Sequence, residues 1–537
     1  MRLFLSLLTA GWSQRCWIAL TAFAFLAIHA PLAADDEAKS GPSIQIVPPP
    51  KSSVFAATFS KDGRQIALAC EDKLVTIHDA TTGKLRFRLE GHAERVWTAA
   101  FSPDGATLAS CSGEYSRPEA GGAVKLWDLK TGKEKVSFTG HRGLVFHVTF
   151  SPDGKTLLSA GWDGAVKLWD VATGREKTTL TEHTGPVRTI VYSPDGKTFA
   201  TAGWDGMVRF FDAATVKQQK SFKAHDVGVQ GLAFSSCGRY LATIPRPKDE
   251  TAGDEITLWD LTSGLELGRL TGHRHNILSV DFSPDGKMLI SGGGWFSQYG
   301  EVKLFEMASG KERADLTDVQ NHKEWVECVK FSPDGQLLVS AGGATAGVPG
   351  QVYVRRLADL LKKKPSADPS TEQLQVLWDT LADADAVRAY QAVLTLTSSP
   401  RVTVPFLKDR IKPISPPDRD RAAKTPELIA KLDDDSFQVR ERAAKELEEL
   451  GELAGPALRK ELDGSPSPEV RRQVTRILHQ LQFPGSSPEL LRAMRAIEVL
   501  EQIATPEAKA VLETLASGTA KDRVASEAKV SLKRMTK

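Results

Sequence analysis

Short stretches in which apolar and polar residues alternate recur through much of the chain. Examples are VFHVTF at 145–150, TLLSA at 156–160 and AVKLW at 165–169. Alternation with a period of two, bounded by turns rich in Gly, Pro and Asp, predicts short antiparallel strands. Beyond residue 357 the apolar positions recur every three or four residues, which predicts helices. We therefore expect a multidomain protein with an all-β part followed by an all-α part.

The β part is a repeat. The turn sequence FSPDG or a close variant occurs in seven copies, which begin at Phe59, Phe101, Phe150, Tyr192, Phe234, Phe282 and Phe331. Each copy lies between two predicted strands, and a third strand follows. A fourth, such as 176–180, leads to a Gly-His pair or a relic of one. A regular period of this kind indicates a repeat architecture with one four-stranded unit per copy.

The Gly-His pair, the SPDG turn and a closing Trp-Asp, as at 127–128, 169–170 and 259–260, resemble the WD40 repeat family. The resemblance covers residues 43–358 and implies a seven-bladed β-propeller with four strands in each blade. The seventh unit lacks its fourth strand. Ser43 to Val47 is expected to supply that strand and to close the ring, which would remove an exposed sheet edge.

The resemblance also implies a buried tetrad in the third repeat, where polar side chains satisfy the indole N–H of a tryptophan. Its members are His141, Ser159, Asp163 and Trp169. Other residues replace the tryptophan in four repeats, so we expect those blades to be held by packing alone. The four positions are His78, Phe211, Phe305 and Arg355.

The repeats differ in length at one connection. The interval from the Ser or Thr of the second strand to the Trp position is short in repeats three and four, at 159–169 and 201–211. It is longer in repeats two, five, six and seven, at 110–127, 243–259, 291–305 and 340–355. The extra length therefore lies between the second and third strands, on one face of the propeller. Insertions on a single face often mark a binding face, although any one loop could be tolerated length without a role.

Eight residues of this face are predicted to bind a partner. Five follow the first apolar position of an inner strand and are expected at the mouth of the central channel: Phe55, Trp97, Phe146, Arg188 and Glu327. Three lie in the loops: Trp162, Trp204 and Trp295. Exposed aromatic clusters mark interaction sites. In the alternative interpretation, the aromatic side chains simply plug the channel.

The helical tail is expected to have two parts. Residues 359–423 read as a linker with short helices, and residues 424–537 as an all-α domain. The apolar stripes of 437–450 and 468–481 share a Val-Arg pair, at 439–440 and again at 470–471. They resemble HEAT repeats, which implies a solenoid and a second binding surface. A helical bundle would show similar stripes.

The beginning of the chain predicts the compartment. Two arginines precede the apolar run 16–28, and the small residues of 31–34 lead into an acidic stretch. This layout predicts a signal peptide at 1–34, a linker at 35–42, and an exported protein, periplasmic or extracellular, without membrane association after cleavage. The alternative is that 16–34 stays uncleaved as a membrane anchor.

Composition and motifs narrow the function. With 69 Lys and Arg against 67 Asp and Glu, the formal charge of +2 disfavours nucleic-acid binding by bulk charge. Five scattered cysteines show no metal-binding spacing, and no catalytic or cofactor motif is visible. We therefore expect no catalytic residues, no metal and no cofactor.

The expected function is an exported, non-enzymatic scaffold for a protein or peptide partner. The alternative is an enzyme or carbohydrate-binding propeller with a pocket at the channel mouth, built from Arg117, Arg188, Arg246 and Asp249.

Overall fold

The computed structural model describes residues 44–46, 52–117, 120–247, 254–262, 264–295, 299–317, 322–343, 350–360, 368–411, 424–450, 454–464, 466–480, 488–518 and 523–535. The predicted signal peptide (1–34) and linker (35–42) lie outside these ranges. Of the helices described, none is long and apolar enough to cross a membrane.

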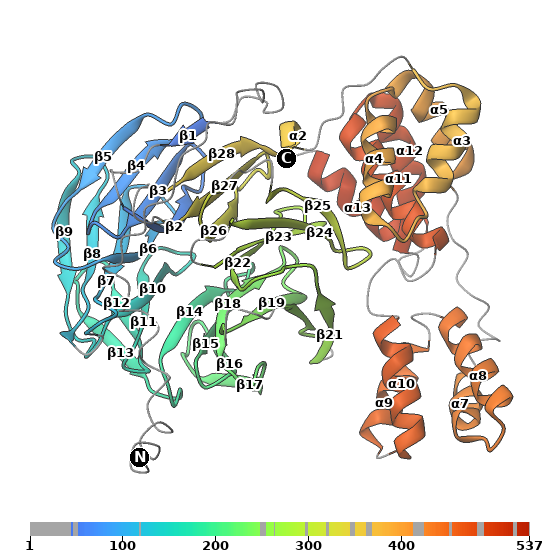
Figure 1. The fold of residues 1–537 in the computed structure, drawn as a ribbon, viewed down its shortest axis with the longest axis horizontal. Coiled ribbons are helices and arrows are strands. Elements are labelled where there is room, and N and C mark those ends of the chain that lie inside the picture. Colours follow the sequence, from blue (N-terminus) through green and yellow to red (C-terminus); the bar gives the residue numbers. More distant parts are fainter. Residues whose placement is uncertain are drawn as a thin grey trace, which may run out of the picture.

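In the described residues the strands form seven four-stranded antiparallel sheets, which are the blades of a propeller (Figure 1). Blades 1 to 3 consist of β2 Val54–Phe59, β3 Gln65–Cys70, β4 Val75–Asp79, β5 Leu85–Leu89; β6 Val96–Phe101, β7 Thr107–Ser112, β8 Val124–Asp128, β9 Lys133–Phe138; and β10 Val145–Phe150, β11 Thr156–Gly161, β12 Val166–Asp170, β13 Glu176–Leu180. Blades 4 to 6 consist of β14 Val187–Tyr192, β15 Thr198–Gly203, β16 Met207–Asp212, β17 Gln218–Lys223; β18 Val229–Phe234, β19 Tyr240–Pro245, β20 Ile256–Asp260, β21 Leu265–Leu270; and β22 Ile277–Phe282, β23 Met288–Gly293, β24 Glu301–Glu306, β25 Lys311–Asp315.

Blade 7 closes the ring with both ends of the β part. It consists of β26 Val326–Phe331, β27 Leu337–Gly342, β28 Val352–Arg356 and, as its outer strand, β1 Ile44–Ile46. Ile44 lies opposite Val354 in an antiparallel pairing, and Ile46 is buried. The inner strand β26 packs against β2 of blade 1. The predicted seven-bladed architecture and its closure are thus confirmed.

The SPDG segments form the turns between the first and second strands. In blade 3, Ser151 Oγ donates to Asp153 Oδ1 at 2.6 Å, and the backbone N–H of Lys155 donates to the same oxygen at 3.0 Å. Gly154 follows with φ +72°, a conformation that favours glycine. The aspartate of this motif is therefore a structural turn residue.

The predicted tetrad hydrogen bonds are present in blade 3. Trp169 Nε1 donates to Ser159 Oγ at 2.8 Å, and His141 Nε2 lies 2.7 Å from the same hydroxyl. His141 Nδ1 lies 3.1 Å from the Asp163 carboxylate. The polar side chains of this buried group thus satisfy one another, which offsets the cost of burying them.

The expectation that the blades without this tryptophan are held by packing alone is wrong for blades 4, 6 and 7. The histidine still binds the second-strand hydroxyl in blades that lack the tryptophan, as His183 does with Thr201 at 2.8 Å. In blade 6, Glu301 takes the place of the aspartate and lies 3.3 Å from His273 Nδ1. The pair forms without an indole because the hydroxyl can bond to the histidine ring by itself. The acceptor position of the hydroxyl that an indole N–H would occupy then stays unused.

The tail forms helices close to the predicted ranges. They are α2 Leu357–Leu360, α3 Thr371–Thr380, α4 Ala386–Thr397, α5 Pro400–Arg410, α7 Thr425–Ala430, the 3-10 helix η2 Lys431–Asp433, α8 Phe437–Leu450, α9 Gly455–Asp463, α10 Pro468–Gln480, α11 Pro488–Ile503, α12 Pro506–Ala516 and α13 Arg523–Met535.

These helices do not divide at residue 424 as the sequence predicts. One apolar core joins α3–α5 to α11–α13, which we call the tail bundle, so 359–423 is no mere linker. Helices α7–α10 share a separate core, and Figure 1 shows them as a second group beside the tail bundle. The segment 424–480 is therefore an insertion within the bundle. Periodicity missed this division because an apolar stripe does not specify which helix it faces.

The tail bundle packs against blade 6. Its core is continuous with that of the blade and includes Leu304 and Leu316 from the propeller side and Tyr390 and Val393 from α4. Helix α4 contacts the outer strand β25. The propeller and the tail bundle therefore share one apolar core, and the bundle covers the outer edge of blade 6.

Candidate functional site

The long connections lie where the sequence predicts them, between the second and third strands. In blade 2 this connection runs from Ser112 to Val124, whereas in blade 3 it runs only from Gly161 to Val166. Blades 5, 6 and 7 also have long connections, parts of which lie outside the described residues. We call the side of the propeller that carries these connections the long-loop face.

A continuous arc of aromatic rings crosses the long-loop face. The ring-centre distances are 4.7 Å for Phe55–Trp97, 5.9 Å for Trp97–Phe146, 6.0 Å for Phe146–Trp204 and 5.1 Å for Trp162–Trp204. Tyr115 contacts both Trp97, at 6.3 Å, and Trp162, at 5.7 Å. We call these six residues the aromatic arc. Five of them are predicted by the sequence, and the structure brings those five together.

A bulge in each inner strand places the channel-mouth residues. In β10 the register shifts between Val145 and His147, so that Phe146 is the extra residue. The same shift occurs at the second position of all seven inner strands, including those of Trp97 and Arg188. A bulge leaves one residue out of the strand pairing and turns its side chain away from the regular pleat.

The two loop tryptophans are held by their backbones. The backbone N–H of Trp162 donates to the carbonyl of Leu144 at 2.8 Å, and the backbone N–H of Trp204 donates to the carbonyl of Pro186 at 2.9 Å. Both side chains are only partly buried, and their rings meet edge to face at 79°. Short turns with fixed backbones present these rings with little freedom, which lowers the entropic cost of using them in an interface.

Phe146 differs from its neighbours in the arc because it is 1% exposed. It lies among Trp97, Trp162 and Trp204, with the Arg188 guanidinium 5.0 Å from its ring centre. Its side chain therefore supports the arc from below. Phe55, Trp97, Trp162 and Trp204 are partly exposed and form the accessible part.

Charged groups stand beside the arc. The guanidinium carbon of Arg188 is 5.9 Å from the ring centre of Trp97, and that of Arg246 is 3.8 Å from Trp204. Glu327 accepts a hydrogen bond of 2.6 Å from the indole of Trp325, which is itself buried. Burial raises the pKa of Glu327, while the same hydrogen bond and the Arg188 charge oppose the increase.

Trp295 and Tyr115 complete the comparison between the predicted site and the structure. Trp295 is partly buried beyond the end of β23, and its role in binding stays a prediction. Tyr115 belongs to the arc, although the sequence does not predict it as a site residue. It lies on the long connection of blade 2, and strand periodicity does not fix where a loop side chain points.

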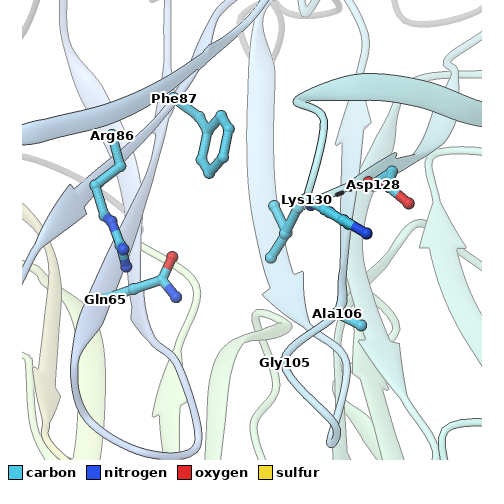
Figure 2. A pocket seen from close by; sticks show the side chains of 8 residues that line it. Gln65, Arg86, Phe87, Gly105, Ala106, Asp128 and Lys130 are labelled. Carbon is cyan, nitrogen blue, oxygen red and sulfur yellow. Dashed lines mark hydrogen bonds between the residues drawn. The ribbon is translucent and has the colours of Figure 1, made fainter.

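Two cavities lie away from the arc. One, of about 590 Å³, lies between blades 1 and 2. It is lined by Gln65, Arg86 and Phe87 on one side and by Asp128 and Lys130 on the other (Figure 2). Another, of about 400 Å³, lies beside the inner-strand ends at Phe59, Phe101 and Phe150, next to the SPDG turns. Both are on the face opposite the long loops.

Three of the four residues proposed for the polar pocket of the enzyme alternative are described, and each contacts another side chain. Arg117 pairs with Glu94 at 3.2 Å, whereas Arg188 and Arg246 lie over aromatic rings. Asp249 lies outside the described residues. Within the described ranges, no three His, Cys, Asp or Glu side chains are grouped so that they could hold a metal ion. Burial raises the pKa of the Cys111 thiol to about 12, which keeps it protonated.

A family model described as WD domain, G-beta repeat, matches six segments: 83–128, 132–170, 174–212, 216–244, 264–305 and 314–346. These segments are WD40 repeats. The first three WD40 segments correspond to β5–β8, β9–β12 and β13–β16, so each contains the outer strand of one blade and three strands of the next. Strands β2–β4 of blade 1 lie outside the matches, and His78 stands there at the tryptophan position.

The chain is also similar to the WD repeat-containing protein SL1-17 of Schistosoma mansoni. The two are 42% identical over 59 residues, which is 11% of this chain and 19% of that protein. The chain thus matches about a fifth of the relative's length. WD40 propellers are typically protein-interaction scaffolds and are generally non-enzymatic.

Proposed function

We propose that this protein is an exported, non-enzymatic scaffold that binds a protein or peptide partner on the long-loop face of its WD40 propeller. The observation that carries the proposal is the aromatic arc, whose partly exposed rings gather at the channel mouth. Aromatic side chains in contact with one another and beside arginines have the composition of interface hot spots. If aromatic side chains on this face served only to plug the central channel, no tryptophan would be needed at the tips of the two short turns.

The test compares partner capture by two pairs of substitutions in the intact mature chain. Trp162→Ala with Trp204→Ala should reduce capture at least ~10-fold, because central aromatic side chains typically contribute ~2 kcal/mol or more. The matched control is Lys155→Ala with Lys197→Ala, which alters exposed turn residues on the opposite face. Captured proteins are quantified by mass spectrometry, and the melting temperature of each variant shows that the fold is retained.

Full capture by the tryptophan variant would contradict the proposal. If capture were then lost when 424–480 is replaced by a flexible linker, the helical insertion would be the recognition module. We also propose the helical insertion as a second binding module for a partner protein. Helices α8 and α10 begin at Phe437 and Pro468, and their apolar stripes share one core, which supports a HEAT-like pair.

Export rests on the sequence of residues 1–34, which lie outside the described part of the chain. The three buried thiols, Cys70, Cys111 and Cys328, are compatible with an oxidising compartment because burial raises their pKa values and limits oxidation. Mass spectrometry of the protein recovered from the extracytoplasmic fraction should find an N-terminus near Ala34 or Asp35. An intact Met1 in a membrane fraction would instead favour the retained anchor.

A further inference from the structure

Two arginine side chains of the long-loop face lie on aromatic rings. Arg188 lies over the ring of Phe146 and Arg246 over that of Trp204, at 5.0 and 3.8 Å. Neither guanidinium group forms a hydrogen bond or a direct ion pair with any residue that the structure describes. A guanidinium stacked by its face on a ring still has its N–H edges available for an acceptor.

The described acidic side chains near the arc are already engaged. Arg95 pairs with Glu71 at 3.1 Å and with Glu114 at 3.4 Å. Glu327 accepts the indole N–H of Trp325. The charge of Glu327 acts on Arg188 without a direct ion pair, and neither Arg188 nor Arg246 is hydrogen-bonded to a carboxylate of the described residues, so both cations can bind a negatively charged ligand.

Both cations act on one part of the arc. Burial raises the pKa of Tyr115, while the charges of Arg246 and Arg188 oppose that increase. The Tyr115 hydroxyl thus lies within electrostatic range of both guanidinium groups. Burial also lowers the pKa of Arg188, and Glu327 only partly offsets that effect. A guanidinium in such a desolvated position interacts more strongly with a carboxylate than one in bulk water does.

The contacts between the arginines and the rings show the order in which charged and apolar groups follow one another along the arc. Arg188 contacts Phe146, Phe146 contacts Trp204, and Trp204 contacts Arg246. The two cations therefore flank the contacting rings of Phe146 and Trp204. The partly exposed Trp162 contacts both of these rings. A ligand that satisfies this path has an apolar group between two negative charges.

We propose that the partner recognised at this face is an acidic peptide segment of the form acid–apolar–acid. Arg188 and Arg246 each bind an Asp or Glu carboxylate through their N–H groups, and a large apolar side chain between them packs on Trp162 and Trp204. This inference rests on the proposed function, because it names the partner class for the same surface.

The test uses a phage-displayed library of random dodecapeptides, selected on the immobilised mature chain, 35–537. Peptides that fail to bind the Trp162→Ala, Trp204→Ala variant are synthesised, and their affinity is measured by fluorescence polarisation. We expect these peptides to carry Asp or Glu on both sides of an aromatic or large aliphatic residue. Their affinity should also fall as NaCl is raised from ~50 to ~300 mM, because salt screens exposed charges.

Substitutions then locate the carboxylate contacts. Arg188→Gln and Arg246→Gln should each lower affinity at least ~10-fold, and replacing the peptide acids by amides should have little further effect in those variants. Arg410→Gln is the matched control, because Arg410 lies 3.7 Å from the Phe406 ring centre on helix α5, in the tail bundle. Melting temperatures show whether each variant is folded, and Arg188→Lys keeps the charge if the glutamine variant is not.

The outcomes separate the two proposals. Peptides that need Trp162 and Trp204 but lack acids, or that bind Arg188→Gln unchanged, would overturn the acidic-segment inference and leave the scaffold proposal standing. A phosphoserine version that binds more than ten times tighter than the acidic peptide would also overturn it, in favour of a phosphopeptide. If no selected peptide depends on the two tryptophans, the proposed function itself fails.

Discussion

Arg495 of α11 and Glu306 of β24, 189 residues apart in the chain, form a buried ion pair with two hydrogen bonds. Arg495 Nε lies 2.9 Å from Oε1 and Nη2 lies 2.6 Å from Oε2, and the two side chains are 1% and 4% exposed. Arg495 Nη1 also donates to the carbonyls of Leu381 and Asp383 at 2.8 Å. One side chain thus connects blade 6, the end of α3 and the last three helices, and it fixes the tail bundle on the propeller.

Removing this arginine should destabilise the protein strongly. Arg495→Met removes the paired charge and two hydrogen bonds from the buried Glu306 carboxylate, which keeps only the donor hydroxyl of Ser309, and it also removes the donor to two carbonyls. Breaking a buried pair from one side costs ~3–5 kcal/mol. The free energy of unfolding from urea titration measures the loss. Arg388→Met is the control, because its side chain is 68% exposed in the pair with Asp383, and an exposed pair contributes ~1 kcal/mol or less. Similar losses in both variants would contradict the role of Arg495.

The contact between the tail bundle and blade 6 should weaken in acid. Burial alone would raise the pKa of Glu501, but hydrogen bonds and charges from Arg534 and Lys287 lower it to about 2. A carboxylate with a lowered folded pKa contributes stability above its unfolded pKa of ~4.3, and that stability is lost as pH falls toward the folded value. The stability difference between the wild type and Glu501→Gln should therefore shrink between pH ~4.5 and ~2. A difference that is constant across this range would refute the assignment.

The helical insertion should be removable. Helices α7–α10 bury their apolar side chains in their own core, so replacing 424–480 by a flexible linker exposes little of the core shared by the tail bundle and blade 6. We expect the melting temperature of the remainder to change by only a few degrees. Deleting α11–α13 instead should cause aggregation, because it uncovers Leu396 and Leu407 of the bundle. Equal damage from both deletions would mean that the insertion is part of the same folding unit.

The tetrad of blade 3 can be tested with one substitution. Trp169→Phe removes the indole donor to Ser159 and leaves a space in a buried site, for an expected loss of ~1–3 kcal/mol in denaturant titration. Trp378→Phe, in a partly buried side chain of α3, is the control for loss of an indole outside the propeller. A loss below ~0.5 kcal/mol would show that the hydrogen bond to Ser159 contributes nothing measurable.

Much of the fold follows from local pattern. The seven turn copies and the period of two give the blades, because a strand's alternation depends only on which side of its own sheet is buried. The closing role of residues 44–46 follows from a count of strands in the last unit. The helices of the tail follow from stripes and from proline at their first turns, as at Pro488 and Pro506.

The candidate site could be predicted only in part. Ring position within the repeat gives Phe55, Trp97 and Phe146, and turn length gives Trp162 and Trp204. The sequence does not show that Phe146 is buried beneath the others, or that Tyr115 joins them from a long loop. Both depend on the shift of register in the inner strands and on the path of the loop, which side-chain alternation does not encode.

By itself, then, the sequence determined the elements, their order and the face on which the repeats vary, since each is a property of neighbours along the chain. Only the tertiary structure decided which elements share a core. The pairing of α3–α5 with α11–α13 across an insertion, the ion pair of Arg495 with Glu306, and the path from Arg188 through Phe146 and Trp204 to Arg246 all join distant residues. Contacts of this kind form when chain segments pack in three dimensions, and no local period specifies the partner.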